Sequence, residues 1–88
     1  MKKIEFYNNK NIISVRLKQA RKEKALSQSE LAAKLQLYNI NMDQQMISRI
    51  EKNERQVTDY EVACICKCLN ISVEWLLQDL TKYIKTAE

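Results

Sequence analysis

The chain has 88 residues, a net charge of +4 and an apolar fraction of 45%, which fits one small domain and leaves no room for a cofactor domain beside a core. It contains no glycine and no proline, which argues against the tight turns of hairpins and favours an all-α domain. Residues 11–55 carry nine Lys or Arg against five Asp or Glu, whereas residues 56–88 carry three against five. A basic segment attracts nucleic acid or an anionic surface, and a solvated helical surface is the alternative.

Several classes of protein are disfavoured by what the chain lacks. No apolar run approaches the roughly 18 residues that span a bilayer, and the basic N-terminus precedes no hydrophobic region, so no membrane partner and no signal peptide are expected. Three cysteines in one short stretch fit a reducing compartment, and we expect a cytoplasmic protein. Without histidine or a Gly-rich phosphate loop, an enzyme is not expected, nor are a cofactor and a small-molecule substrate.

The chain divides into an N-terminal arm, a helical domain and a C-terminal tail, at residues 1–10, 11–80 and 81–88. The sequence leaves open whether the arm is loose or packed. A first helix is predicted over residues 12–24, with Asn11 as its N-cap. Three apolar residues spaced i, i+4 and i+7 form its buried face: Ile13, Leu17 and Ala20.

Capping signals mark the next two helices. Ser27 and Glu30 have the spacing of a capping box, which predicts a helix that ends near Leu37. Asp43 is a good N-cap for a third helix. Asn53 is its expected end, because asparagine tolerates the left-handed conformation that glycine usually supplies.

The C-terminal half predicts two more helices. Thr58 and Glu61 repeat the capping-box spacing, and "YEVACICKCL" is apolar nearly all round, which indicates a central buried helix. Asn70 is the residue expected to follow that helix, and the last helix opens at Ser72.

The ordered features resemble a known family. The stretches "RLKQARKEKALSQSELAAKL", "QQMISRIEKNERQ" and "TDYEVACICKCLNISVEWLL" are similar to the lambda-repressor-like, Cro-like DNA-binding domain of bacterial and phage XRE-type regulators. The resemblance covers most of the chain, from Val15 to Leu77. It implies a compact five-helix bundle in which the second and third helices form a helix-turn-helix, with the third helix in the DNA major groove.

The connector between these two helices departs from the family pattern. Residues 38–43 give a turn of six residues, against the roughly three or four of a standard helix-turn-helix. The family usually has glycine just after the second helix, where this chain has Gln36. Extra loop length costs little free energy, and Ile40 and Met42 are apolar anchors. We therefore expect the helix pair to persist with a bulged turn, part of which extra helical residues absorb.

The resemblance implies that the third helix contacts bases. The expected base-contacting residues are Gln44, Gln45, Ser48 and Arg49, with Met46 a weaker candidate. The chemistry fits, because a glutamine amide matches the major-groove edge of adenine and an arginine fork matches guanine. The alternative is a solvent-exposed helix position for the glutamines and a surface ion pair for Arg49.

Phosphate contacts are expected on both sides of that helix. Gln28 opens the second helix, where family members hold a phosphate with help from the helix amides. The other phosphate candidates are Lys52, Asn53, Arg55, Arg16 and Lys18. The alternative for Gln28 is an idle first-turn residue.

Three further predictions concern structure. The resemblance implies an ion pair between Arg21 and Glu51. Trp75, Leu76 and Leu80 are candidates for a dimer surface, with core packing as the alternative. Cys64, Cys66 and Cys68 cannot close a tetrahedral metal site from one helix, so we expect core packing and no metal.

Two functions follow from these observations. The first is a sequence-specific, double-stranded DNA-binding transcriptional regulator, a repressor that acts as a homodimer and blocks polymerase. The second is a protein-interaction module, antitoxin-like or regulator-binding, with secondary DNA binding. Its contact surface would be the connector residues Tyr38, Ile40 and Met42.

Overall fold

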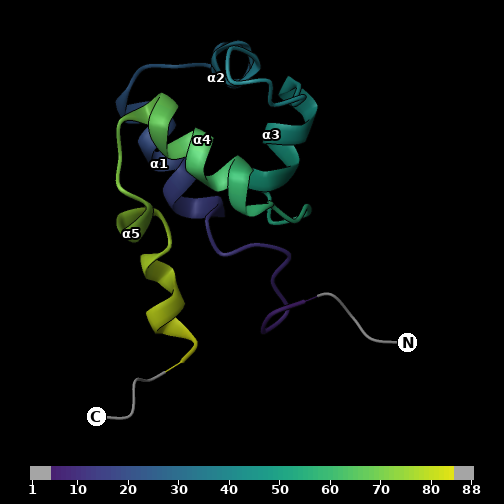
Figure 1. The fold of residues 1–88 in the computed structure, drawn as a ribbon. Coiled ribbons are helices and arrows are strands. Elements are labelled where there is room, and N and C mark those ends of the chain that lie inside the picture. Colours follow the sequence, from purple (N-terminus) through teal and green to yellow (C-terminus); the bar gives the residue numbers. More distant parts are fainter. Residues whose placement is uncertain (1–4, 85–88) are drawn as a thin grey trace.

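The computed structural model describes residues 5–84, and within this range the fold is all helical (Figure 1). Its elements are α1 (Ser14–Glu23), α2 (Gln28–Gln36), α3 (Gln44–Glu51), α4 (Asp59–Leu69), α5 (Val73–Leu76) and the 3-10 helix η1 (Gln78–Lys82). Helix α3 packs against α1 and α2, while α4 packs against α2 and α5. The predicted five-helix bundle is confirmed. The short 3-10 helix after α5 was not predicted.

The apolar periodicity of the sequence produces one core. Its fully buried side chains come from every α-helix, the residues before α1 and the connector: Ile13, Leu17, Leu31, Leu35, Met42, Ile47, Ile50, Ile65, Leu69 and Leu76. The prediction that α4 is a central buried helix is only half right. Ile65 and Leu69 are buried, but Tyr60 is 62% exposed and Lys67 lies on the same exposed side.

The helices begin largely where their capping residues predicted. Ser27 and Thr58 complete capping boxes with Glu30 and Glu61, and the Asp43 carboxylate accepts the Met46 amide at 2.9 Å. Helix α1 is the exception, because Ile13 occupies its N-cap position without a side-chain cap. The prediction of Asn11 as that cap is wrong.

Four helices of this glycine-free chain end in the same way. Ala25, Asn39, Asn53 and Asn70 have positive φ angles of 57°, 62°, 62° and 54°. After each of them, the next amide donates to the carbonyl five residues earlier, as Ile40 does to Leu35 and Glu54 does to Arg49. This is the Schellman motif that usually contains glycine. Asparagine takes the place of glycine three times, as predicted for Asn53 and Asn70.

The residues before α1 are packed rather than loose. Phe6 and Asn9 exchange two backbone hydrogen bonds of 2.9 and 2.8 Å around a turn, and the rings of Phe6 and Tyr7 lie 5.8 and 5.6 Å from the ring of Tyr83. In Figure 1 this segment and η1 lie on the lower side of the bundle, away from α2. The ends of the predicted arm and tail, residues 1–4 and 85–88, lie outside the described residues.

Candidate nucleic-acid interface

Helix α3 has one buried face and one exposed face. Ile47 and Ile50 are fully buried and hold the helix on the core. At about 100° per residue, the five positions Gln44, Gln45, Ser48, Arg49 and Lys52 fall within one sector of about 140°. All are exposed except Ser48, which is half-buried. The four predicted base-contacting residues therefore share one outward face, and the half-buried Met46 lies at its edge.

The connector between α2 and α3 is more firmly packed than its length suggested, and it fixes the position of α3. The Schellman motif at Asn39 continues the turn of α2 beyond Gln36, so helical residues absorb part of the connector as predicted. Ile40 is 6% exposed and Met42 is fully buried. The prediction that Tyr38, Ile40 and Met42 form a protein-interaction surface is therefore wrong for two of the three residues, because only Tyr38 is exposed.

The other end of α3 is fixed by a buried ion pair. The Arg21 guanidinium donates to both carboxylate oxygens of Glu51, at 2.6 and 2.9 Å, and to the carbonyl of Leu26 at 2.8 Å. The two side chains are only 9% and 3% exposed. The hydrogen bonds from Arg21 to Glu51 raise the pKa of the guanidinium despite its burial. The predicted pair is present and ties α1 to α3.

A chain of amides links this pair to the exposed face. Gln28 donates to Glu51 at 3.0 Å and accepts from the side-chain amide of Gln44 at 2.6 Å. The amide of Gln28 keeps one further N–H for a ligand, and that of Gln44 keeps one N–H and its oxygen. Gln44 is thus held in place through Gln28 and the Arg21–Glu51 pair, whereas the exposed side chains of Gln45 and Arg49 make no hydrogen bond within residues 5–84.

The phosphate candidates are not all available. Lys52 and Lys18 are exposed and form no ion pair within residues 5–84. Arg16 binds Asp79 at 2.9 Å and lies over the Trp75 ring at 4.8 Å. It therefore joins α1 to η1, and a phosphate contact of Arg16, which stays a prediction, would compete with these contacts.

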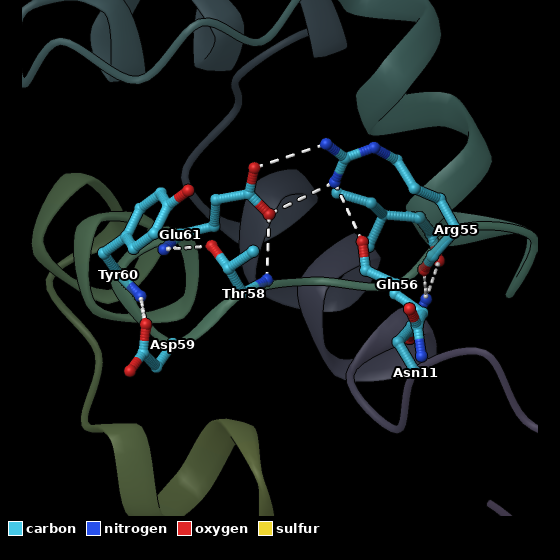
Figure 2. A network of polar contacts seen from close by, with 8 residues as sticks. Asn11, Arg55, Gln56, Thr58, Asp59, Tyr60 and Glu61 are labelled. Carbon is cyan, nitrogen blue, oxygen red and sulfur yellow. Dashed lines mark hydrogen bonds and ion pairs between the residues drawn. The ribbon is translucent and has the colours of Figure 1, made fainter. Parts of the chain in front are cut away.

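Arg55 is also committed within the protein (Figure 2). It donates to both oxygens of Glu61 at 3.2 and 3.3 Å and to the carbonyl of Gln56 at 2.9 Å. Glu61 closes the capping box of α4 by accepting the Thr58 amide at 3.0 Å. Arg55 thus joins the end of α3 to the start of α4. The sequence missed this role because the capping box showed only the local partner of Glu61.

The Glu61 network predicts a pH dependence. Burial of Glu61 raises its pKa, but the hydrogen bonds from Arg55 and Thr58 outweigh burial, so the pKa lies below the ordinary 4.5. Its stabilising contribution is therefore complete above about pH 4.5 and is lost as the pH falls through the lower, folded-state pKa. We expect Glu61→Gln to cost about 1–3 kcal/mol at pH 7, and less at pH 3, by urea denaturation.

Glu30→Gln is the matched control. Hydrogen bonds in its capping box also lower the pKa of Glu30, but Glu30 is exposed and has no arginine partner. A Glu61→Gln penalty that stays constant from pH 7 to pH 3 would contradict the ionic role of Glu61.

The dimer candidates separate in the structure. Leu76 is fully buried inside the chain, so its place on a dimer surface is wrong. Trp75 is half-buried beneath Arg16, and Leu80 is half-buried. Both line a shallow surface depression beside Leu77 and Thr81.

The cysteines pack as predicted. Cys66 is buried, and Cys64 and Cys68 are half-buried against the core. Burial raises the pKa of the Cys66 and Cys68 thiols, as expected for unreactive side chains. Residues 5–84 contain no group of three His, Cys, Asp or Glu side chains placed to hold a metal ion. None of the described helices is long and apolar enough to cross a membrane.

This geometry agrees with comparisons to known proteins. A Helix-turn-helix family model matches residues 17–76, which include all of α2 and α3. The chain belongs to this family. A solved structure of a tyrosine-to-phenylalanine mutant of the restriction-modification controller protein C.Esp1396I is 33% identical, with a TM-score of 0.63, over 82% of this chain and 90% of that chain. A search of curated proteins gives no match.

The helix-turn-helix family and this fold are those of DNA-binding transcriptional regulators, which are not enzymes. The resemblance to XRE-type regulators is confirmed. The family assignment covers α2 and α3 but says nothing about the contacts of Asn11 and Asn53. The Asn53 side chain accepts the backbone amide of Asn11, and the Asn11 side chain donates to the carbonyl of Arg55. The sequence did not predict these contacts, because an asparagine before a helix is also a common N-cap residue.

Proposed function

We propose that this regulator binds a specific double-stranded DNA sequence as a homodimer, with α3 in the major groove. The outward face of α3 carries the proposal. Gln45 and Arg49 lie one helical turn apart on it, so each side chain is able to reach a base edge on the same groove floor. Gln44 and Ser48 are the neighbouring base-contacting candidates.

Phosphate contacts would hold α3 in register. Gln28 begins α2, where backbone amides favour an anion, and it keeps one amide N–H beyond its bonds to Glu51 and Gln44. Lys52 and Lys18 are exposed cations. These three contacts would position the protein without selecting a sequence.

The proposed dimer places two copies of α3 about 34 Å apart on one side of the duplex, one helical turn of DNA. The half-buried Trp75 and Leu80 are the candidates for the surface between the copies. Bound in this way, the protein would repress by blocking polymerase. The similarity to a restriction-modification controller supports genes of that kind as the first targets to examine.

In-vitro selection from random duplex DNA tests the proposal. We expect an inverted repeat whose half-sites are centred about 10 base pairs apart. Affinity for it should fall steeply between 50 and 200 mM salt, because counterions are released from the phosphates. Enrichment of no motif, with salt-sensitive binding to all duplexes, would reduce the function to nonspecific phosphate binding.

A further inference from the structure

Asn53 binds the segment before α1, which we call the arm clasp and define as residues 6–11. Its side-chain oxygen accepts the backbone amides of Lys10 and Asn11 at 2.9 and 3.0 Å. Its side-chain nitrogen donates to the side chain of Asn9 at 2.6 Å. All three partners are 42 to 44 positions away in the chain. The predicted phosphate contact of Asn53 therefore competes with bonds already made.

Asn11 makes the reciprocal connection. Its side-chain amide donates to the carbonyl of Ile50 at 3.0 Å and to that of Arg55 at 2.9 Å (Figure 2 shows it beside Arg55). The Ile50 carbonyl lies in the last turn of α3 and also accepts the backbone amide of Asn53 at 3.0 Å. Two asparagine side chains thus join the arm clasp to the last turn of α3 and to the residues directly after it through five hydrogen bonds.

The arm clasp is anchored at its other end as well. Tyr7 and Asn8 have positive φ angles of 50° and 65°, and the Asn9 side chain donates to the carbonyls of Phe6 and Tyr7 at 3.0 and 3.1 Å. The Tyr7 ring stacks on Tyr83 at 5.6 Å. A segment held at both ends is able to transmit a restraint to α3, which a loose arm is not.

We infer that Asn53 is a positioning residue that fixes the C-terminal end of α3 through the arm clasp and so sharpens DNA sequence discrimination without touching DNA. This inference rests on the DNA-binding function proposed above. Base contacts require donor–acceptor distances near 3 Å, and they weaken steeply with small displacements. Arg49 lies one turn before Asn53, so a displacement of this end of α3 would move Arg49 more than the other proposed base-contacting residues.

Glycine substitution isolates the side chain of Asn53. Asn53→Gly keeps the positive φ of 62° without strain and removes all three side-chain bonds. Asn70→Gly is the matched control, because Asn70 ends α4 with φ 54° in the same motif and its side chain makes no hydrogen bond within residues 5–84. We expect Asn53→Gly to lower the ratio of selected-site to scrambled-site affinity about tenfold, while Asn70→Gly changes it less than about twofold.

Asn53→Asp distinguishes positioning from direct phosphate contact. The carboxylate still accepts from the amides of Lys10 and Asn11, so positioning predicts a partial rescue of the affinity ratio relative to Asn53→Gly. If Asn53 contacted phosphate, the carboxylate would instead be repelled, and Asn53→Asp would bind selected and scrambled sites alike more weakly than Asn53→Gly, with no rescue of the affinity ratio. That order of affinities would overturn the inference.

Amide hydrogen exchange of Lys10 and Asn11, measured without DNA, tests the arm clasp on its own. We expect exchange at both amides to accelerate in Asn53→Gly and to remain slow in Asn70→Gly. Accelerated exchange with an unchanged affinity ratio would overturn the positioning role and leave the proposed function intact. If the wild type selects no sequence, the proposed function fails and the inference fails with it, whatever the exchange data show.

Discussion

Replacing Arg21 by alanine should lower the free energy of unfolding by about 3–5 kcal/mol, because it leaves the Glu51 carboxylate buried without its cation. Glu51 is only 3% exposed in the ion pair and would keep one hydrogen bond, from Gln28. For a domain of this size each kcal/mol shifts the melting temperature by roughly 4–8 °C, so the decrease should exceed about 10 °C. Thermal and urea denaturation measure it, with an unchanged m-value as evidence of a pure stability effect.

The double variant Arg21→Met/Glu51→Leu is the matched control. Replacing both partners of a buried pair by apolar residues removes the unpaired charge, so most of the lost stability should return. DNA sequence discrimination should not return with it, since Gln28 loses its anchor at Glu51 and no longer holds Gln44 in place. An Arg21→Ala variant that melts within about 2 °C of the wild type would show that the pair does not stabilise the fold in solution.

The helix boundaries could be predicted because their signals are local. Capping boxes at Ser27 and Thr58 satisfy amides three residues away, and a chain without glycine has few other residues for left-handed helix ends. The sequence therefore located the ends at Asn53 and Asn70. Ala25 carried no comparable signal, although it adopts φ 57° in the same motif.

The partners of the charged residues could not be predicted in the same way. Arg16 and Asp79 are 63 positions apart, and η1, which carries Asp79, was not predicted. The sequence offered a cation near a predicted DNA-binding helix, and phosphate was the simplest ligand. Arg21 was assigned correctly only because the family resemblance supplied its partner.

The long connector illustrates a third case. Its apolar residues Ile40 and Met42 predicted that it would be anchored, and both are buried. The left-handed residue that usually follows the second helix is Asn39, three positions after Gln36. Extra length was thus taken up by continuing the helix, which leaves the buried faces of α2 and α3 free to set their angle.

Removing Gln45 and Arg49 together should abolish sequence selection while leaving the fold intact. Both side chains are exposed and neither makes a hydrogen bond within the described residues 5–84, so Gln45→Ala/Arg49→Ala should change the melting temperature little. Each base contact contributes about 1–3 kcal/mol of discrimination. The double variant should therefore bind the selected site about 100-fold or more weakly, by fluorescence anisotropy at fixed salt, with a much smaller loss on a scrambled duplex.

Lys52→Ala separates base contact from charge, because Lys52 is exposed on the same face of α3 but is assigned to phosphate. It should weaken both duplexes by a similar factor and reduce the slope of log affinity against log salt by about one. In the double variant, the lost charge of Arg49 accounts for at most a loss of affinity like that of Lys52→Ala, which is the same on both duplexes. If Gln45→Ala/Arg49→Ala loses affinity equally on selected and scrambled DNA, these residues only contact phosphate, and the sequence must be recognised elsewhere on α3.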